Sequence, residues 1–378
     1  MTVKKIGLIT TLNSNIGDDF IREGICRILD EIFKNKSIEF VSVNKHKPYT
    51  AYPAWHPIHL MGFTGRLHFG RQFVRRTADS LFSAMGFSRF DSCDLIVQCG
   101  APVFWPNCHL NEWAKPLWKD IIGRLHERIP VFNLAAGSCY PWERQPSKID
   151  TPEDEKYLRA ILGYCRLTTV RDRLSHDLCA TLSHDVPLIP CSALLVGRGR
   201  KAPVTQSGYI LINYMAGGGH YAWNQEIDNR AWEKTVKSLI ARLSKRHKLA
   251  FLCHDEQEFC LTKKLAPELP VFFPKSSREY LQCVSGAMFA VCNRMHASVA
   301  MAGLGIPSIA ICTDTRLLMV SQIGLATHYV KDVTADGIED EAENGLKSLR
   351  SEQDRLLALQ SRTWERYTSA VKEALCLL

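Results

Sequence analysis

The chain has 378 residues, of which 46% are hydrophobic and 23% are charged, and its formal net charge at pH 7 is +8. This length suits two domains and this balance is globular, which excludes a disordered or fibrous chain. The mild basic bias suits anionic ligands, but the sequence has no zinc finger, RNA-binding signature or dense basic helix, so we expect no nucleic-acid partner.

Short apolar runs alternate with longer amphipathic stretches through the first half of the chain, a pattern that predicts strands separated by helices. The expected strands are residues 5–12, 38–43, 94–99, 130–136, 166–170 and 186–190. The expected helices are residues 18–33, 112–128 and 173–182. Because the strands are apolar throughout, we expect them to be parallel and covered on both faces.

Residues 44–90 interrupt this rhythm with aromatic residues, prolines and the stretch HPIHLMGFTGRLH, which holds three histidines. Four arginines lie close together in its middle part, namely Arg66, Arg71, Arg75 and Arg76. Insertions of this length are commonly functional or mobile. Two interpretations remain open. One is an arm that faces the substrate or touches a membrane surface through residues 66–89, and the other is a solvated amphipathic helix with a loop.

The segment 197–208 is rich in Gly, Pro and basic residues and is the best candidate for an interdomain linker. The strand and helix pattern restarts after it. The expected strands are residues 208–214, 248–254, 270–273, 287–293, 307–312 and 328–330. The expected helices are residues 231–246, 277–284, 294–304 and 315–325, with a last one at 351–378.

We therefore predict an α/β protein with two Rossmann-like domains, 1–196 and 208–350, that face each other across a cleft. The carboxyl ends of the strands should point into this cleft. The helix 351–378 should pack across the domain junction and bridge the two domains.

Cysteine usage and the chain start indicate the cellular compartment. Five of the 14 cysteines lie in or beside apolar runs, where a reduced thiol packs as a small core residue: Cys99, Cys191, Cys253, Cys292 and Cys312. No CxxC pair, HExxH or His/Cys cluster with ligand spacing is present, so we expect no metal. The first apolar run stops at Asn13, and no segment is apolar enough to span a membrane. We expect a cytoplasmic protein, with the inner membrane surface as an open alternative.

The sequence CNRMH, at 292–296, is the strongest candidate site. It follows a predicted buried strand, and Asn293 is expected to cap the next helix. Arg294 and His296 then fall in the first helical turn, where free N–H groups and the helix dipole favour an anion. The alternative is a basic surface turn.

Two further strand-to-helix turns have a similar construction. In VRDRLSHDL, Arg171 ends a strand and Asp172 is placed to cap the next helix, although a local Arg–Asp pair is equally compatible. In NIGDDF, Asn15, Gly17 and Asp18 form the first such turn, where Gly17 permits a close backbone approach and Asp18 could equally be a cap.

A glycine run follows the first strand of the second domain. Backbone N–H groups there could cradle a phosphate, although a glycine run alone is a weak signal and a flexible loop is the simpler interpretation. The residues are Gly217, Gly218, Gly219 and His220.

Taken together, NIGDDFIREGI, VRDRLSHDLC and CNRMHASVAMAGLGIPSIAI resemble, in the same order, the motifs of the polysaccharide pyruvyl transferase family. The resemblance implies a two-domain fold like that of GT-B glycosyltransferases, with the acceptor on the N-terminal and the donor on the C-terminal domain. It also implies transfer of a pyruvyl group from phosphoenolpyruvate, as donor substrate and without a cofactor, onto sugar hydroxyls to form a ketal. The acceptor would be a sugar or glycan, lipid-linked or nucleotide-linked.

The chemistry of this reaction suits the candidate residues. Arg294 and Arg171 can each grip an oxyanion bidentately. His296 is suited to protonate the methylene carbon of the donor, and Asp18 to accept the hydroxyl proton or orient the acceptor.

The sequence also departs from the family pattern. Cys99, Gly100 and Ala101 replace the usual glycine triplet, Cys191 stands where an aspartate is common, and Asp314 with Arg316 stands where an acidic residue and a lysine are common. Two rivals remain: a GT-B sugar-nucleotide glycosyltransferase whose loop 217–219 holds a diphosphate, and a noncatalytic sugar-binding relative.

Overall fold

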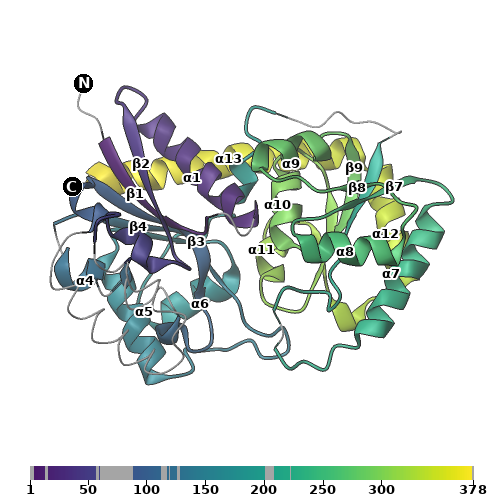
Figure 1. Cartoon of the computed structure of the whole chain (residues 1–378), viewed down its shortest axis with the longest axis horizontal. Coiled ribbons are helices and arrows are strands. Elements are labelled where there is room, and N and C mark those ends of the chain that lie inside the picture. The colour runs from purple at the N-terminus through teal and green to yellow at the C-terminus, as the bar shows by residue number, and fades with distance from the viewer. Residues whose placement is uncertain are drawn as a thin grey trace.

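A computed structural model of the chain describes residues 4–12, 16–56, 59, 88–111, 117–118, 120–125, 128–200, 208–221 and 223–376. Within these ranges it contains two parallel β-sheets, which lie side by side with helices around them (Figure 1). The predicted α/β class with two Rossmann-like sheets is confirmed. The domain limits at 196 and 208 stay a prediction, since residues 201–207 lie outside the described part.

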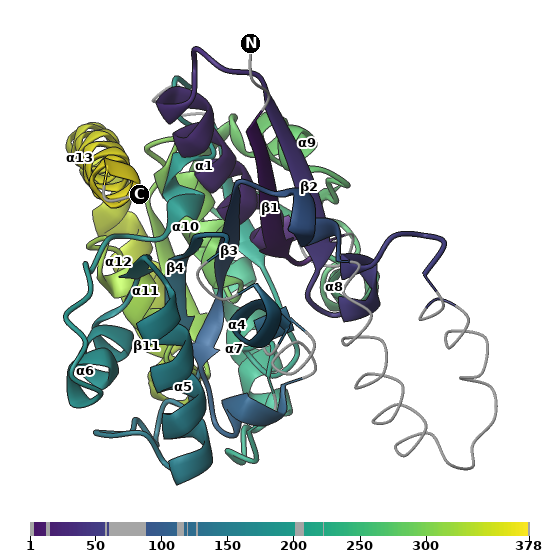
Figure 2. The same ribbon diagram turned by 90° about the vertical axis from the view of Figure 1, so that its left-hand side faces the viewer.

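The N-terminal sheet has five strands in the order β2-β1-β3-β4-β5. Its strands are β1 (Lys4–Thr10), β2 (Ile38–Asn44), β3 (Leu95–Phe104), β4 (Val131–Ser138) and β5 (Leu167–Val170). Its helices are α1 (Ile16–Ile32), α4 (Asp120–Arg124), α5 (Pro152–Tyr164) and α6 (Arg173–Thr181). Figure 2 shows α1 on one side of this sheet and α4 and α5 on the other. Because helices cover both faces of the sheet, most side chains of its strands are buried, and the strand sequences are continuous apolar runs.

The C-terminal sheet has six strands in the order β11-β10-β9-β6-β7-β8. Its strands are β6 (Tyr209–Asn213), β7 (Lys248–Leu252), β8 (Val271–Phe272), β9 (Ala287–Cys292), β10 (Ser308–Cys312) and β11 (Ala326–Tyr329). Its helices are α7 (Asn229–Leu243), α8 (Glu256–Leu265), α9 (Ser277–Val284), α10 (Met295–Ala302), α11 (Leu317–Ser321), α12 (Ala335–Lys347) and the long α13 (Leu349–Cys376). Every residue of β9 and β10 is buried, so this pair forms the centre of the second core.

One hydrophobic core runs through both domains. It contains Phe20 of α1 and Tyr280 of α9, whose ring centroids lie 4.6 Å apart. A short 3-10 helix, η6 (Ser192–Leu195), is packed between α1 and α10. Because apolar surface is shared across the boundary, the two sheets are held in a fixed relative position rather than joined only by a linker.

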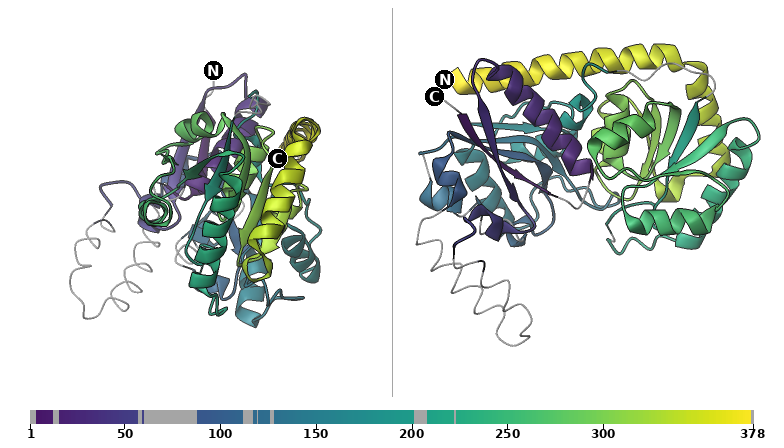
Figure 3. Two further views of the ribbon diagram at one scale, coloured as in Figure 1. Left: turned by 90° about the vertical axis from the view of Figure 1, so that its right-hand side faces the viewer. Right: turned by 45° about the horizontal axis from the view of Figure 1, so that its top comes forward.

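The C-terminal helix bridges the domains, as predicted. Figure 3 shows α13 running along the outside of both sheets. Its Gln360 side chain lies buried and donates to the backbone carbonyl groups of Leu194, in η6, and of Gly303, after α10. Tyr367 and Val371 of the same helix are buried in the shared core.

Two loops also interlock on the other side of the junction. The backbone N–H of Trp142 donates to the carbonyl of Thr313 at 3.0 Å, and that of Thr315 donates to Tyr140 at 2.9 Å. The Thr315 hydroxyl in turn accepts from the Tyr140 N–H at 3.0 Å. The end of the N-terminal sheet is thus hydrogen-bonded to the end of the C-terminal sheet.

Some predicted elements were wrong. Residues 186–190 do not form a strand, because only a single bridge joins Leu188 to Val170. Within the expected helix 112–128, the described part contains an α-helix only at Asp120–Arg124. Three helices, α5, α8 and α12, were not predicted, although α5 and α12 bury apolar residues at helical spacing.

The insertion cannot be compared with its two interpretations, because residues 57–58 and 60–87, including the four arginines, lie outside the described part. Among the described residues, no helix combines the length and the low polarity needed to cross a lipid bilayer. The five core cysteines named from the sequence are all buried.

The packing of η6 against α1 can be tested at Gly24. A Cβ atom there would overlap the backbone carbonyl of Ser192, whereas a Cβ at Gly163 in α5 would meet nothing within 4 Å. We expect Gly24→Ala to lower the free energy of unfolding by about 1–3 kcal/mol, since backbone atoms must shift. Gly163→Ala should be neutral or stabilising by up to about 1 kcal/mol. Chemical denaturation of both variants measures this, and equal stabilities would contradict the packing.

Candidate active site

Five charged or titratable side chains gather where the two sheets meet. They follow the carboxyl ends of β1, β2, β5, β9 and β10, and we call them the junction cluster: Asp18, Lys45, Arg171, His296 and Arg316. Their charges act on one another, because the other four all influence the pKa of His296. Carboxyl ends of parallel strands are where α/β proteins bind ligands.

Arg171 is the most unusual member of the cluster. Its side chain is only 1% exposed, yet no carboxylate of the described residues forms an ion pair with it. Its Nη1 lies 3.2 Å from Nε2 of His296 and 3.8 Å from Sγ of Cys191, while Nε and Nη2 have no hydrogen-bond partner among the described residues. Burial of a charge without a counter-charge is costly, so the free energy of this protein falls if an oxyanion meets these donors.

The backbone around Arg171 is shaped to admit its side chain. Gly137, in β4, faces the guanidinium so closely that a Cβ atom there would overlap Nε. Cys191 lies on the other side, and burial raises the pKa of its thiol despite the nearby Arg171. The thiol is therefore neutral, and it leaves the charge of Arg171 unbalanced.

His296 lies in the first turn of α10, half-buried beside Arg171. Burial and the charge of Arg171 hold the pKa of His296 well below its ordinary value, against the opposing effect of Asp18. Since Arg171 Nη1 can only donate, Nε2 of the imidazole accepts and its proton is on Nδ1. In the ligand-free protein His296 is therefore neutral at pH 7.

Asp18 is the carboxylate of the cluster. It lies in the first turn of α1, with Gly17 buried beside it, whereas Asn15 lies outside the described residues. Burial would raise the pKa of Asp18, but Lys45, His296 and other neighbours outweigh it and hold that pKa below the usual value. Asp18 is therefore ionised at pH 7 and available as a base.

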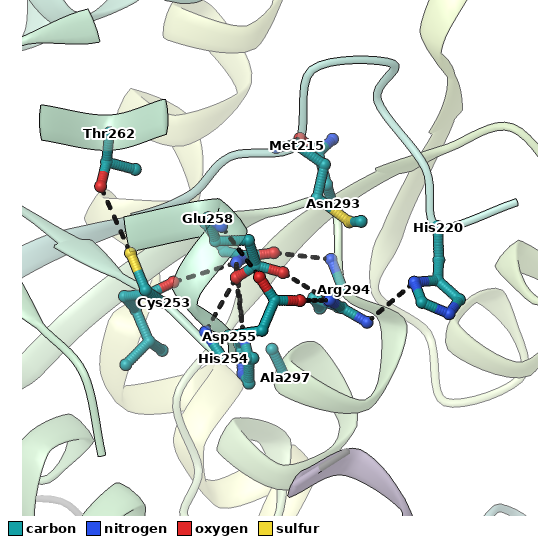
Figure 4. A network of polar contacts seen from close by, with 12 residues as sticks. Met215, His220, Cys253, His254, Asp255, Glu258, Thr262, Asn293, Arg294 and Ala297 are labelled. Atoms are coloured by element: carbon teal, nitrogen blue, oxygen red, sulfur yellow. Dashed lines mark hydrogen bonds and ion pairs between the residues drawn. The ribbon is translucent and has the colours of Figure 1, made fainter. Parts of the chain in front are cut away.

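Arg294 was expected to bind an anion, but in the structure its guanidinium is already paired with carboxylates. Figure 4 shows its guanidinium between two carboxylates of the α8 region: Nε donates to Glu258 at 2.5 Å and Nη2 to Asp255. Only Nη1 points elsewhere, toward Nδ1 of His220 at 3.2 Å. Burial would raise the pKa of Glu258, yet His254 and Arg294 lower it to about 2, so the pair is ionic.

Asn293 does not cap α10, contrary to the prediction. Arg294 occupies the cap position, and its side chain makes no capping hydrogen bond. Asn293 instead accepts from the N–H of Met215 and donates to the carbonyl of Ile311, both at 2.9 Å. The Asn293 side chain therefore links the loop after β6 to β10 instead of capping α10. Asp172 does cap α6, as predicted, and pairs with Ser138 and Ser175 rather than with Arg171.

The glycine run has a packing explanation at two of its positions. A Cβ at Gly218 would overlap Val330, and one at Gly219 would overlap the Thr313 hydroxyl. The loop after β6 therefore lies against the sheet. Burial, Arg294 and Arg316 lower the pKa of His220 to about 4, so this histidine is neutral at pH 7. A role of Gly217, Gly218 and Gly219 in phosphate binding stays a prediction.

Two members of the cluster were not among the predicted site residues. Lys45 is 4% exposed and directly follows β2, a position that could have singled it out. Arg316 was noted only as a departure from a family pattern. Its Nε and Nη2 donate to Asp314 at 2.8 and 2.7 Å, and its guanidinium lies 4.7 Å from the ring centroid of Tyr221.

Two Rossmann-like domains that meet at their strand ends give this chain a GT-B-like fold. The model of the family described as polysaccharide pyruvyl transferase matches residues 15–314. The chain belongs to this family, and it is a transferase.

Solved structures agree with the fold. A putative UDP-N-acetylglucosamine 2-epimerase from Listeria monocytogenes is 9% identical, with 99% of this chain and 97% of that one covered and a TM-score of 0.57. The S. aureus MnaA–UDP co-structure is 12% identical, with 99% and 98% covered and a TM-score of 0.58. A Neisseria meningitidis UDP-GlcNAc 2-epimerase bound to UDP-GlcNAc is 10% identical, with 99% and 100% covered and a TM-score of 0.54. At these identities the likeness concerns the fold alone. No curated protein matches the sequence.

The protonation state of His296 gives a testable pH dependence. Its folded-state pKa is depressed below 6.5, so protonation opposes folding and stability is lost as pH falls below that value. Inorganic phosphate bound beside Arg171 should raise this pKa, because it brings negative charge. Imidazole NMR titrations, assigned with His296→Gln, should show a depressed pKa that rises with phosphate. A value of 6.5 or above in the free protein would contradict the geometry.

Proposed function

We propose that this chain transfers the pyruvyl group of phosphoenolpyruvate to hydroxyl groups of a sugar in a cell-surface or exopolysaccharide precursor, forming a ketal. The observation that carries the proposal is the buried Arg171, in contact with His296, with two donors that have no partner in the part of the chain that the structure describes. The family supplies the reaction class, and the junction cluster supplies the chemistry.

Charge balance favours an anionic donor in the junction cluster. Arg316 is matched by Asp314 in a two-hydrogen-bond ion pair. Arg171 and Lys45 then face Asp18 as the remaining carboxylate of the cluster. The cluster has one positive charge in excess while His296 is neutral. A phosphate group that reaches Nε and Nη2 of Arg171 would change the net charge of the cluster from positive to negative. The planar guanidinium can bind two oxygens of the phosphate at once.

The second anionic group of the donor needs its own anchor. Arg294 presents only Nη1 toward a neutral partner, His220, since its other nitrogens are held by carboxylates. We assign the carboxylate of phosphoenolpyruvate to this Nη1 edge or to Arg316. In this assignment Asp255 and Glu258 fix the orientation of Arg294 rather than compete for it.

The bond changes follow from these positions. The imidazolium of His296 gives a proton to the methylene carbon of the donor, and a sugar hydroxyl attacks the adjacent carbon while its proton goes to Asp18. The carbon–oxygen bond to phosphate then breaks, and a second hydroxyl attacks the same carbon as its proton leaves with the phosphate. The products are a cyclic ketal and inorganic phosphate.

His296 must acquire its proton when the donor arrives. In the free protein burial and Arg171 keep its pKa low. Bound phosphate adds negative charge beside the ring. This charge favours the imidazolium, so the acid forms only in the presence of the donor. The proposal requires no cofactor.

The rival with a sugar nucleotide would use the loop after β6 for a diphosphate. Packing against Val330 and Thr313 already explains why residues 218 and 219 are glycines. The glycine run is therefore no longer an argument for a sugar-nucleotide enzyme. The proposed acceptor is a lipid-linked or nucleotide-linked glycan in the cytoplasm, and contact with a membrane through residues 66–89 stays a prediction.

Substitution of the two proton-transfer residues should separate donor binding from chemistry. His296→Gln should bind phosphoenolpyruvate about as well as the parent, and Asp18→Asn should bind it as well or more tightly, because a carboxylate that repels phosphate is gone. Each should slow ketal formation roughly 10²–10⁴-fold, the usual effect of losing a positioned acid or base. Calorimetry and phosphate release measure the two quantities on the same samples.

Arg173→Gln is a matched control, because Arg173 is an exposed arginine that pairs with Asp177 on α6. It should change neither quantity. Normal turnover by His296→Gln or Asp18→Asn would remove that residue from the mechanism. A loss of donor binding that matches the loss of turnover would make it an anchor instead.

A further inference from the structure

A strip of aromatic side chains crosses the domain junction beside the cluster. Trp105 follows β3 in the N-terminal domain, whereas Tyr221 and Trp223 lie in the loop after β6 of the C-terminal domain. The ring centroid of Trp105 lies 4.8 Å from that of Tyr221 and 5.0 Å from that of Trp223. We call these three residues the aromatic strip. All three are half-buried, so part of their surface reaches solvent.

The strip is continuous with the proposed donor anchors. The Arg316 guanidinium lies over the Tyr221 ring, 4.7 Å from its centroid. His220, which contacts Arg294, lies 4.7 Å from the same ring in an edge-on arrangement. A sugar that rests on Trp105 would therefore lie one aromatic ring away from the cations that hold the donor.

The three rings are not stacked in parallel. The Trp105–Tyr221 pair meets at 83° and the Trp105–Trp223 pair at 59°, so neither is a parallel stack. In addition, Nε1 of Trp223 is a buried donor for which the described residues provide no hydrogen-bond partner. An unsatisfied indole N–H among half-buried rings leaves this packing cluster incomplete, since buried donors normally find an acceptor.

The loop that carries two of these rings is held in place. Gln225 donates to the carbonyl of Thr313 at 2.9 Å, and Met215 donates to Asn293 at the same distance. Arg144 of the N-terminal domain donates to the Trp223 carbonyl at 3.4 Å. A platform that is already ordered loses little conformational entropy when a ligand binds.

We propose that the aromatic strip is the acceptor subsite, where the apolar face of a sugar ring stacks on Trp105 and a sugar hydroxyl accepts from Nε1 of Trp223. Phosphoenolpyruvate is small, doubly anionic and without a ring, so it has no use for these side chains. A pyranose has one C–H-rich face and a rim of hydroxyls, which matches an indole face flanked by a donor. The inference rests on the proposed function for the reaction, but the sugar binding itself is independent of it.

Saturation-transfer-difference NMR tests the subsite on the full chain. The probes are methyl β-D-galactopyranoside, methyl β-D-glucopyranoside and methyl α-D-mannopyranoside, each with and without phosphoenolpyruvate. Variants are Trp105→Phe, which keeps an aromatic face, and Trp105→Leu, which keeps apolar volume without one. Trp55→Leu is the matched control, because Trp55 is 66% exposed and lies outside the strip.

We expect at least one glycoside to receive saturation on the C–H protons of one ring face. Its dissociation constant should rise roughly tenfold in Trp105→Leu, stay within about threefold in Trp105→Phe, and not change in Trp55→Leu, in line with the usual effect of losing an aromatic anchor. Phosphoenolpyruvate affinity, measured on the same variants, should not change.

The subsite is overturned if no glycoside binds, or if Trp105→Leu binds glycosides as well as the parent does. It is also overturned if Trp105→Leu weakens the binding of phosphoenolpyruvate and of the glycoside equally, because a residue that only holds the two domains together would have that effect. Failure of the proposed function looks different. In that case phosphoenolpyruvate does not bind the parent, while a Trp105-dependent glycoside signal would still support a saccharide site.

Discussion

The positive charge of Arg171, buried without a carboxylate partner, is the constraint around which the junction is organised. An unpaired buried charge costs several kcal/mol, so a folded protein retains one only where something else completes it. The features around it accommodate the guanidinium without neutralising it. Gly137 leaves room for it, Cys191 stays a neutral thiol beside it, and His296 accepts one of its N–H groups while uncharged. In the proposed function, a dianionic donor supplies the missing partner.

Arg171 and Arg294 differ in whether a carboxylate balances their charge. Both arginines follow buried strands, and the sequence alone treats them alike. Arg294 is matched by Asp255 and Glu258, so it is a fixed side chain with one outward edge. Arg171 is matched by nothing of the same kind among the described residues, so it is the side chain whose energy changes most when an anion binds.

The sequence predicts features that depend on neighbouring residues better than features that depend on contacts between distant segments. All predicted strands except residues 186–190, together with α9 and the bridging α13, follow from local apolar patterns, and these predictions are confirmed. The convergence of Asp18, Arg171 and His296 also follows, because carboxyl ends of parallel strands meet at one edge. What could not be predicted is pairing between distant segments. Glu258 lies on a helix with no clear periodicity, and its ion pair with Arg294 is visible only in three dimensions.

The most direct test of the account supplies Arg171 with the counter-charge it lacks. Cys191→Asp places a carboxylate where a neutral thiol now contacts Nη1, and Cys191→Ser is its neutral control. Titration calorimetry with phosphoenolpyruvate should show at least a roughly tenfold weaker affinity in Cys191→Asp, because the guanidinium is already paired, and little change in Cys191→Ser. Equal affinities in the parent and in a folded Cys191→Asp would contradict the claim that the unpaired charge of Arg171 holds the donor.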